Sequence, residues 1–198
     1  MSFDLERSLR SLKPQKRTRP LQRRGDHELH WVDDELPIGA PLFLDTSVYL
    51  DVLQGRSPTP LDDLLRYRIC HHSAVCLAEL THLFGRLNPG HPGTKQVLQV
   101  VHATIDEIPG HRLHAPDSTV WGQAGLLAGQ MSRLSSLPKG DGHERKFLND
   151  ALIYLQAGAL GARILTGNIR DFDYLNQLAP DIGVLFYRAD TTPARTGK

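Results

Sequence analysis

The feature that most constrains the fold of this chain is an alternation, from Ala40 onward, of short apolar runs with longer helical segments. Each apolar run is brief, and the segment after it repeats its apolar residues at helical spacing. Strands and helices that alternate in this way form a parallel sheet covered by helices on both faces. The pattern therefore predicts an α/β fold, with strands at 41–44, 68–73, 112–114, 163–166 and 183–187.

Turn-forming residues separate the helical segments. Gly55 and Gly161 follow two of them, and the run NPGHPG at 88–93 is a strong break. Helices are predicted at 48–54, 61–67, 74–87, 94–105, 116–134, 144–160 and 171–178.

Size and composition place the chain among soluble globular proteins. Its 198 residues suit one domain with a real core and some length left over. No apolar run approaches the ~20 residues that a membrane helix needs, and the N-terminus lacks the apolar centre of a secretory signal. Cys70 and Cys76 fit small core residues better than a disulfide scaffold, so we expect a protein of the reducing cytoplasm.

The first 39 residues differ from the rest of the chain, because they are basic and have few apolar anchors. We expect a flexible extension, with a short helix before Pro14, then a domain at 40–188 and a disordered tail at 189–198. A basic arm can track the phosphates of a nucleic acid. It can equally be a solvated extension or a docking segment for another chain. Its basic residues are Arg7, Arg10, Lys13, Lys16, Arg17, Arg19, Arg23 and Arg24.

Two predicted strands end in oxygen-bearing side chains. Asp45 follows the strand at 41–44, and Asn168 and Asp171 follow the strand at 163–166. Functional groups of an open α/β sheet gather beyond the carboxyl ends of its strands. Asp and Asn also favour turns and helix caps, so a simple N-cap remains an equal reading of Asp45 from its position alone.

Glu79 gives a sharper signal because it lies beside the apolar stripe of its own helix. Val75 and Cys76 precede it by four and three residues, and Leu83 follows it by four. These spacings put the carboxylate on the side of the helix that faces the core.

Asp150 repeats this pattern, with Phe147 three residues before it and Tyr154 four after. An unpaired carboxylate that faces a core costs several kcal/mol, and shifts its pKa or finds a partner. No Lys or Arg is evident on either stripe, so a common cation is the economical explanation for these acids. Hard oxygen ligands favour Mg²⁺ or Mn²⁺.

We assign no functional role to several other polar residues. We expect Asp51 to face solvent, and we read Asp62, Asp63, Asp141 and Asp173 as ordinary loop or helix-start charges. No histidine pair has zinc spacing with a cysteine. The chain also lacks a Walker lysine motif, a glycine-rich dinucleotide loop and a G-x-S-x-G nucleophile elbow.

The order of these motifs resembles the PIN-domain ribonucleases, and within them most closely the VapC-type toxins of bacterial toxin–antitoxin pairs. The motifs are the strand followed by Asp45-Thr46-Ser47, the A-E-L of Glu79, the L-N-D-A-L-I of Asp150 and T-G-N-I-R-D-F at 166–172. Each is short, and their order and spacing make the resemblance specific. It covers roughly residues 41–188.

The resemblance implies a PIN-like three-layer α/β/α sandwich whose central sheet is mostly parallel. It also implies a cytoplasmic, Mg²⁺- or Mn²⁺-dependent endoribonuclease with an RNA substrate, an antitoxin partner and a homodimer. By position, Asp45, Glu79 and Asp150 match the three principal carboxylates, and Ser47, next to Thr46, matches a hydroxyl close to the metal.

The fourth acidic position is open between Asn168 and Asp171, with Asp171 favoured for its charge. Because several carboxylates repel RNA, nearby cations must guide the phosphates. Arg145, Lys146 and Arg170 flank the motifs and are the candidates.

Three other functions compete with a toxin nuclease. One is a PIN-fold nuclease of RNA processing outside any toxin system. Another is a non-catalytic module that binds nucleic acid or protein, although buried carboxylates are costly to retain without catalysis. The third is a phosphohydrolase of the haloacid-dehalogenase kind. That class resembles D-x-D-x-T, and Ser47 stands here where its second acid belongs.

Overall fold

The computed structural model describes residues 3–136 and 142–191. Five strands, all parallel, form one sheet in the order β3-β2-β1-β4-β5. They are β1 (Leu42–Leu44), β2 (Cys70–Ser73), β3 (Leu113–His114), β4 (Arg163–Thr166) and β5 (Val184–Phe186). All five predicted strands are present. The strand order reverses between β1 and β4, and a crevice opens at such a point beyond the carboxyl ends of the strands.

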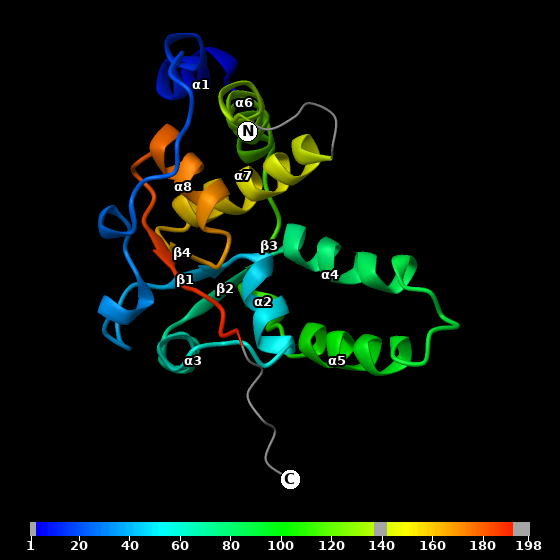
Figure 1. The fold of residues 1–198 in the computed structure, drawn as a ribbon. Helices are drawn as coiled ribbons and strands as arrows, with labels where there is room; N and C mark the ends of the chain where they lie inside the picture. Colours follow the sequence, from blue (N-terminus) through cyan, green and yellow to red (C-terminus); the bar gives the residue numbers. More distant parts are fainter. Residues whose placement is uncertain (1–2, 137–141, 192–198) are drawn as a thin grey trace.

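Helices cover both faces of the sheet, which makes three layers (Figure 1). Above it in this view lie α6, α7 and α8, and below it lie α2 and α3. The α-helices are α1 (Leu5–Leu12), α2 (Thr46–Leu53), α3 (Thr59–Tyr67), α4 (Ala74–Arg86), α5 (Thr94–Asp106), α6 (Ser118–Leu134), α7 (His143–Ala159) and α8 (Ile169–Leu178). The predicted helices match α2 to α8 to within about two residues at most ends.

Burial on both faces explains why β1 reads as a continuous apolar run. Leu42 and Phe43 are fully buried and Leu44 nearly so. Phe43 pairs in register with His71 of β2 on one side and with Ile164 of β4 on the other. Side chains of a strand alternate between faces, so a strand with helices on both sides has no solvent-facing position.

Helices α4 and α5 form a hairpin that projects from the body of the domain (Figure 1). The turn between them contains the predicted break, where Thr94 Oγ1 donates to the Asn88 carbonyl at 2.7 Å. The first turns of α4 stay close to the sheet, because α4 follows β2 directly. This placement brings Glu79 toward the carboxyl ends of β1 and β4.

The N-terminal segment differs from the flexible extension that was expected, because it lies against the domain. The short helix before Pro14 is present as α1, which packs on α6. The backbone NH of Leu21 donates to the Leu134 carbonyl at 2.9 Å, and that of Phe186 donates to the His30 carbonyl at 2.9 Å. The second bond covers the exposed side of β5, the edge strand of the sheet.

A partly buried ion pair attaches the same segment to α8. Arg24 Nε donates to Asp173 Oδ1 at 2.6 Å, and its backbone NH donates to Oδ2 at 2.9 Å. Glu35 further along bridges Arg68 and Arg163, at 2.8 and 2.6 Å. The sequence did not reveal these contacts because each joins residues that lie far apart in the chain.

The remaining structural expectations fall partly outside the described residues. The proposed tail reaches from 189 to 198, of which residues 192–198 lie outside, as does Asp141. Cys70 and Cys76 are buried free thiols, in keeping with their prediction as core residues. Within the described ranges, no helix is long and apolar enough to span a membrane.

Candidate active site

Asp45 lies directly after β1 and is 3% exposed. Its Oδ2 accepts hydrogen bonds from Ser47 Oγ at 2.6 Å and from Thr166 Oγ1 at 2.8 Å. It also accepts the backbone NH of Ser47 at 3.3 Å, which makes Asp45 the N-cap of α2. The reading of Asp45 as a helix cap is therefore confirmed, and the carboxylate also stands at the end of the central strand.

Asp150 is the second buried carboxylate of the site and projects from α7. It is 6% exposed, and its Oδ2 accepts a hydrogen bond from Asn168 Nδ2 at 3.1 Å. Burial, followed by the negative charge of Asp45, raises the pKa of Asp150 well above its ordinary value. Burial likewise raises the pKa of Asp45, against the hydrogen bonds from Ser47 and Thr166.

Neither Asp45 nor Asp150 forms an ion pair with any residue of the described ranges. Their hydrogen-bond donors are hydroxyl groups, an amide and a backbone NH, none of which carries a charge. Both carboxylates thus lie buried near each other without a cation in contact, an arrangement that is costly in the absence of a bound positive charge.

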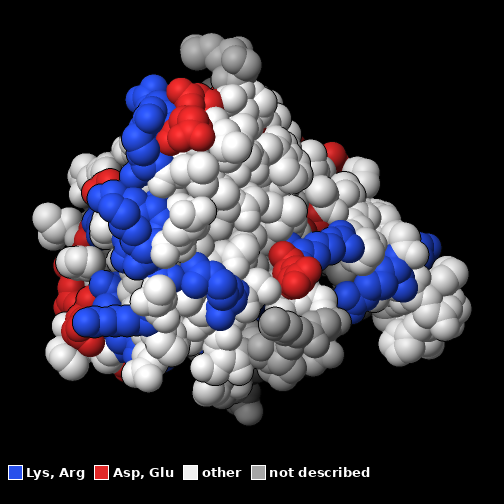
Figure 2. Space-filling view, turned by 90° about the horizontal axis from the view of Figure 1, so that it is seen from above, with Lys and Arg blue, Asp and Glu red and all other residues white. Residues whose placement is uncertain are grey.

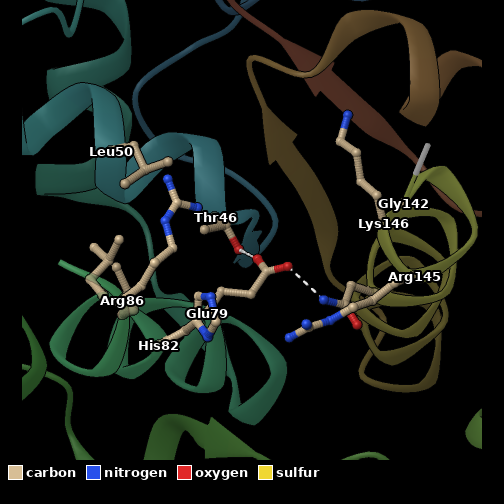
Figure 3. Close-up of a pocket in the computed structure, with 11 residues that line it drawn as sticks. Thr46, Leu50, Glu79, His82, Arg86, Gly142, Arg145 and Lys146 are labelled. Atoms are coloured by element: carbon tan, nitrogen blue, oxygen red, sulfur yellow. Dashed lines mark hydrogen bonds between the residues drawn. The ribbon is translucent and has the colours of Figure 1, made fainter.

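Glu79 reaches the same region from α4 and is half-buried. Thr46 Oγ1 donates to its Oε2, and Asn149 Nδ2 donates to its Oε1 at 2.6 Å. Asn149 precedes Asp150 on α7, and Thr46 follows Asp45. The residues next to the two buried acids in sequence therefore donate hydrogen bonds to the third acid, Glu79. Figure 3 shows Glu79 between α2 and α7.

These side chains line one cavity of about 450 Å³, beyond the carboxyl ends of β1 and β4. The structure therefore brings together groups from four separate parts of the sequence. The lining residues that sequence analysis proposed are Asp45, Thr46, Ser47, Glu79, Lys146, Asp150 and Asn168.

Asp171 lies behind Asn168 and does not line this cavity. It is fully buried, and it accepts hydrogen bonds from Lys146 Nζ and, at 2.9 Å, from Arg170 Nε. Burial opposes its ionisation, but the bonds from Arg170 and Lys146 outweigh burial and hold the pKa of Asp171 below its usual value. Asn168 Nδ2 lies 3.3 Å from Asp171 Oδ2 and joins this carboxylate to Asp150.

The candidate RNA-contacting cations have different surroundings. Lys146 and Arg170 are engaged by Asp171, although about half of each side chain remains exposed. Burial disfavours the charge of Lys146, yet Asp150 and Asp171 raise its pKa. Arg145 is exposed and forms no hydrogen bond or ion pair with the residues that the structure describes.

Asp51 was expected to face solvent, and this prediction is wrong. It is 6% exposed, Tyr187 donates to its Oδ2 at 2.8 Å, and Arg56 pairs with its Oδ1 at 2.5 Å. Asp51 and Arg56 both line the cavity. The sequence around Asp51 did not predict this burial, because its partner Tyr187 lies 136 residues further along the chain.

Asp173 was read as an ordinary loop or helix-start charge, and its burial contradicts this interpretation. It is fully buried beside Arg24, and Gln177 Nε2 donates to its Oδ2 at 2.9 Å. Its position between the buried Phe172 and Tyr174 was a signal that could have indicated burial.

The donor set fits a hard divalent cation in its chemistry. The cavity offers carboxylate oxygens from Asp45, Glu79 and Asp150, and burial with mutual repulsion makes two of these acids hard to ionise. A cation at this place would offset both effects. As the side chains stand in residues 3–136 and 142–191, no three His, Cys, Asp or Glu residues converge as a metal-binding group.

Several solved structures share this fold. The chain is 17% identical to VapBC2 from Rickettsia felis, bound to a DNA fragment from its promoter, with a TM-score of 0.52 over 74% of this chain and 98% of the other. It is 19% identical to VapBC-1 from nontypeable Haemophilus influenzae, with a TM-score of 0.50 over 74% and 97%. It is 20% identical to DNA-bound VapBC from Salmonella typhimurium, with a TM-score of 0.50 over 74% and 97%.

Neither a protein-family model nor a curated protein matches the sequence. At identities of 17–20%, the structural likeness shows the fold alone. The predicted PIN-like three-layer α/β/α sandwich with a central parallel sheet is confirmed.

Proposed function

We propose that this chain is a Mg²⁺- or Mn²⁺-dependent endoribonuclease and the toxin of a toxin–antitoxin pair. One observation carries the nuclease proposal: Asp45 and Asp150 are buried carboxylates without a cation in contact, and they line one cavity with Glu79. A purely structural carboxylate at this depth would have a positively charged partner.

The protein's own residues would hold the cation and orient the substrate. Asp45, Asp150 and Glu79 would bind it, with Asn168 at the rim of the same cavity. Ser47 Oγ and Thr166 Oγ1 both donate to Asp45 Oδ2, so they fix which way this carboxylate faces. Gly167 NH donates to Ser47 Oγ at 2.9 Å and in turn fixes the hydroxyl.

When bound, a divalent cation eases deprotonation of a water and stabilises negative charge on a phosphate. Glu79 or Asp150 would accept the proton of the attacking water. Glu79 is suited to this role because it is only half-buried and both of its hydrogen-bond donors, Thr46 and Asn149, are neutral. Ionised acids at the cavity would repel RNA, so the neighbouring cations would have to attract it.

Two structures of similar fold, VapBC2 from Rickettsia felis and VapBC from Salmonella typhimurium, are VapBC complexes bound to DNA. This likeness supports an antitoxin as the partner of this chain in the cytoplasm. A homodimer is part of the same proposal, and light scattering of the purified chain would measure its mass.

The nuclease proposal is tested by incubating the purified chain with RNA in Mn²⁺, Mg²⁺ or EDTA. We expect internal cleavage with either metal and none with EDTA. Absence of cleavage of total cellular RNA in both metals would contradict it.

The toxin proposal requires a separate test in living cells. Induced expression of the chain is expected to arrest growth, and co-expression of the adjacent small open reading frame is expected to relieve the arrest. Normal growth at a verified level of intact protein would instead favour a nuclease of RNA processing.

A further inference from the structure

The N-terminal segment concentrates positive charge that the proposed cation site does not use. Between positions 7 and 24 the sequence has eight Lys or Arg residues and no Asp or Glu. Figure 2 shows Lys and Arg side chains gathered along one side of the face that is seen from above. Because this segment lies against the domain, its cations form part of a folded surface.

Most of these cations have no acidic partner. Arg23 and Arg24 pair with carboxylates, and Arg17 donates to two neutral backbone carbonyls at the end of α8. The other five side chains are exposed and form no hydrogen bond or ion pair within the described part of the chain. We call these five and Arg17 the basic band: Arg7, Arg10, Lys13, Lys16, Arg17 and Arg19.

The backbone that carries the basic band is fixed to the domain. Arg133 of α6 donates to the carbonyls of Pro14 and Arg17, at 2.8 and 2.9 Å. The backbone NH of Leu21 donates to the Leu134 carbonyl at 2.9 Å. A charged surface whose backbone is already ordered loses less conformational entropy when a ligand binds.

Two adjoining hollows follow the basic band, with volumes of about 480 and 430 Å³. Lys16 lines both of them. Glu6 is the only acid that lines the first hollow, and no carboxylate of the described residues lines the second. Cations spaced along a continuous surface suit a ligand with repeated negative charges. Those that line the hollows are Arg10, Lys13, Lys16, Arg17 and Arg19.

The phosphate backbone of RNA is the polyanion that fits these hollows best. No aromatic side chain is among the residues that line them, so they offer no platform on which unpaired bases stack. A membrane-binding surface would present apolar side chains beside its cations. Within residues 3–34, however, Leu5 is the only large apolar residue that is exposed. The basic band therefore suits phosphate groups rather than bases or lipid tails.

Helix α8 connects the basic band to the acidic cavity. Asn168, its N-cap, lines the cavity, and Leu178 at its other end lines the second hollow. At ~1.5 Å per residue these two ends lie about 15 Å apart, so one RNA molecule can contact both. Lys146 and Arg170 beside the cavity are engaged by Asp171, whereas the basic band adds cations that pair with no acid of the described chain.

We propose that the basic band is a second RNA-binding surface, separate from the acidic cavity. It holds the phosphate backbone of the substrate and reads neither base sequence nor strand state. This inference rests on the proposed ribonuclease function and deepens it, since it assigns the surface that retains the RNA while the cavity acts on it.

The test is RNA binding in EDTA, where no metal-dependent cleavage occurs. Fluorescent single-stranded and duplex RNAs of two unrelated sequences are titrated with wild type, Lys16→Ala/Arg19→Ala and Arg66→Ala/Lys95→Ala. The second double variant is the matched control, because it also removes one Lys and one Arg. Both control residues are exposed, on α3 and α5, and neither lines the hollows or the acidic cavity.

We expect Lys16→Ala/Arg19→Ala to raise the Kd about tenfold for every RNA, single-stranded or duplex. For the single strand, the slope of log Kd against log salt should fall by about 1.4, the loss of two phosphate contacts. The control variant should bind as wild type does. In Mn²⁺, Lys16→Ala/Arg19→Ala should raise KM and leave kcat unchanged. Circular dichroism confirms that each variant is folded.

Equal RNA affinity of the two double variants would overturn the surface, as would a wild type that binds no RNA. A loss confined to one sequence or one strand state would overturn recognition of the backbone alone. Vesicles that contain phosphatidylserine provide a further arm, and loss of vesicle binding with unchanged RNA binding would overturn RNA as the ligand.

Failure of the surface and failure of the ribonuclease are distinguishable. If Lys16→Ala/Arg19→Ala loses RNA binding but wild type cleaves no RNA in Mn²⁺, the ribonuclease is contradicted and the surface stands. If wild type cleaves RNA and both double variants bind it equally, the surface is contradicted and the ribonuclease stands.

Discussion

Asp173 and Asp150 are both buried carboxylates on helices that cover the same face of the sheet, but their surroundings are opposite. Asp173 accepts two hydrogen bonds from Arg24, at 2.6 and 2.9 Å, and a third from Gln177. Asp150 accepts one from the neutral amide of Asn168 and forms no ion pair with the described residues. The first carboxylate is neutralised by the chain itself, and the second is not.

The difference separates a structural acid from a functional one. Arg24 and Asp173 attach the N-terminal segment to α8, so their pairing stabilises the fold. Burial raises the pKa values of both Asp150 and Asp45, and the negative charge of Asp45 at Asp150 and of Glu79 at Asp45 adds to it, so neither carboxylate is stabilised as an anion overall. Such groups persist where a function needs them.

The largest effect is expected on cleavage. Asp45→Asn and Asp150→Asn should each lower metal-dependent RNA cleavage by about 10²-fold or more, because each removes a charge that would hold the cation. Asp173→Asn should retain activity per folded molecule. Initial rates, normalised to the folded fraction from circular dichroism, measure the difference. Equal losses of cleavage in all three variants would contradict the assignment of Asp173 as a structural acid and of Asp45 and Asp150 as functional ones.

The next effect concerns the paired carboxylate. Arg24→Ala leaves Asp173 buried and without a cation, and should lower the free energy of unfolding by about 2–3 kcal/mol. The control is Arg23→Ala, whose pair with Asp26 is exposed and should contribute far less. Urea unfolding measures both. A similar, small change in the two variants would mean that the N-terminal segment is not attached through this pair.

The smallest effect has the opposite sign. Asp150→Asn should raise the stability of the metal-free protein at pH 7 by about 1–2 kcal/mol, because it removes a charge that is costly to bury. The folded-state pKa of Asp150 is raised, so wild-type stability falls as pH rises from about 4 upward through that pKa.

The stability gain of Asp150→Asn over wild type should therefore grow between pH 4 and pH 7. Asp171 has a lowered pKa and loses its contribution as pH falls, but it is present in both proteins and cancels from the difference. Thermal melts across this range provide the measurement. A gain that shrinks with rising pH would show that Asp150 is stabilised as an anion.

Local patterns were sufficient to predict the strands and most helices. The apolar run of β1 and the stripe beside Glu79 depend on periods of two and 3.6 residues, which can be read from a short window. The same reasoning found Asp45, Glu79, Asp150 and Asn168, since each follows a strand or interrupts an apolar stripe. These four line the cavity together.

Long-range contacts were not predictable in this way. The burial of Asp51 depends on Tyr187, and that of Asp173 on Arg24, and neither partner is near in sequence. The basic composition of residues 1–39 suggested a free arm, although Trp31 packs on Phe186 and Arg24 pairs with the fully buried Asp173. Charge along a chain does not reveal which cation has a buried partner.

The central claim is that Asp45 and Asp150 form a cation site, and Mn²⁺ binding tests it most directly. Mn²⁺ is titrated into wild type, Asp150→Asn and Arg24→Ala, with free ion measured by electron paramagnetic resonance. The account predicts saturable binding by wild type and Arg24→Ala, and a loss of about tenfold or more in affinity for Asp150→Asn. Equal affinity of wild type and Asp150→Asn, or no binding by wild type, would contradict it.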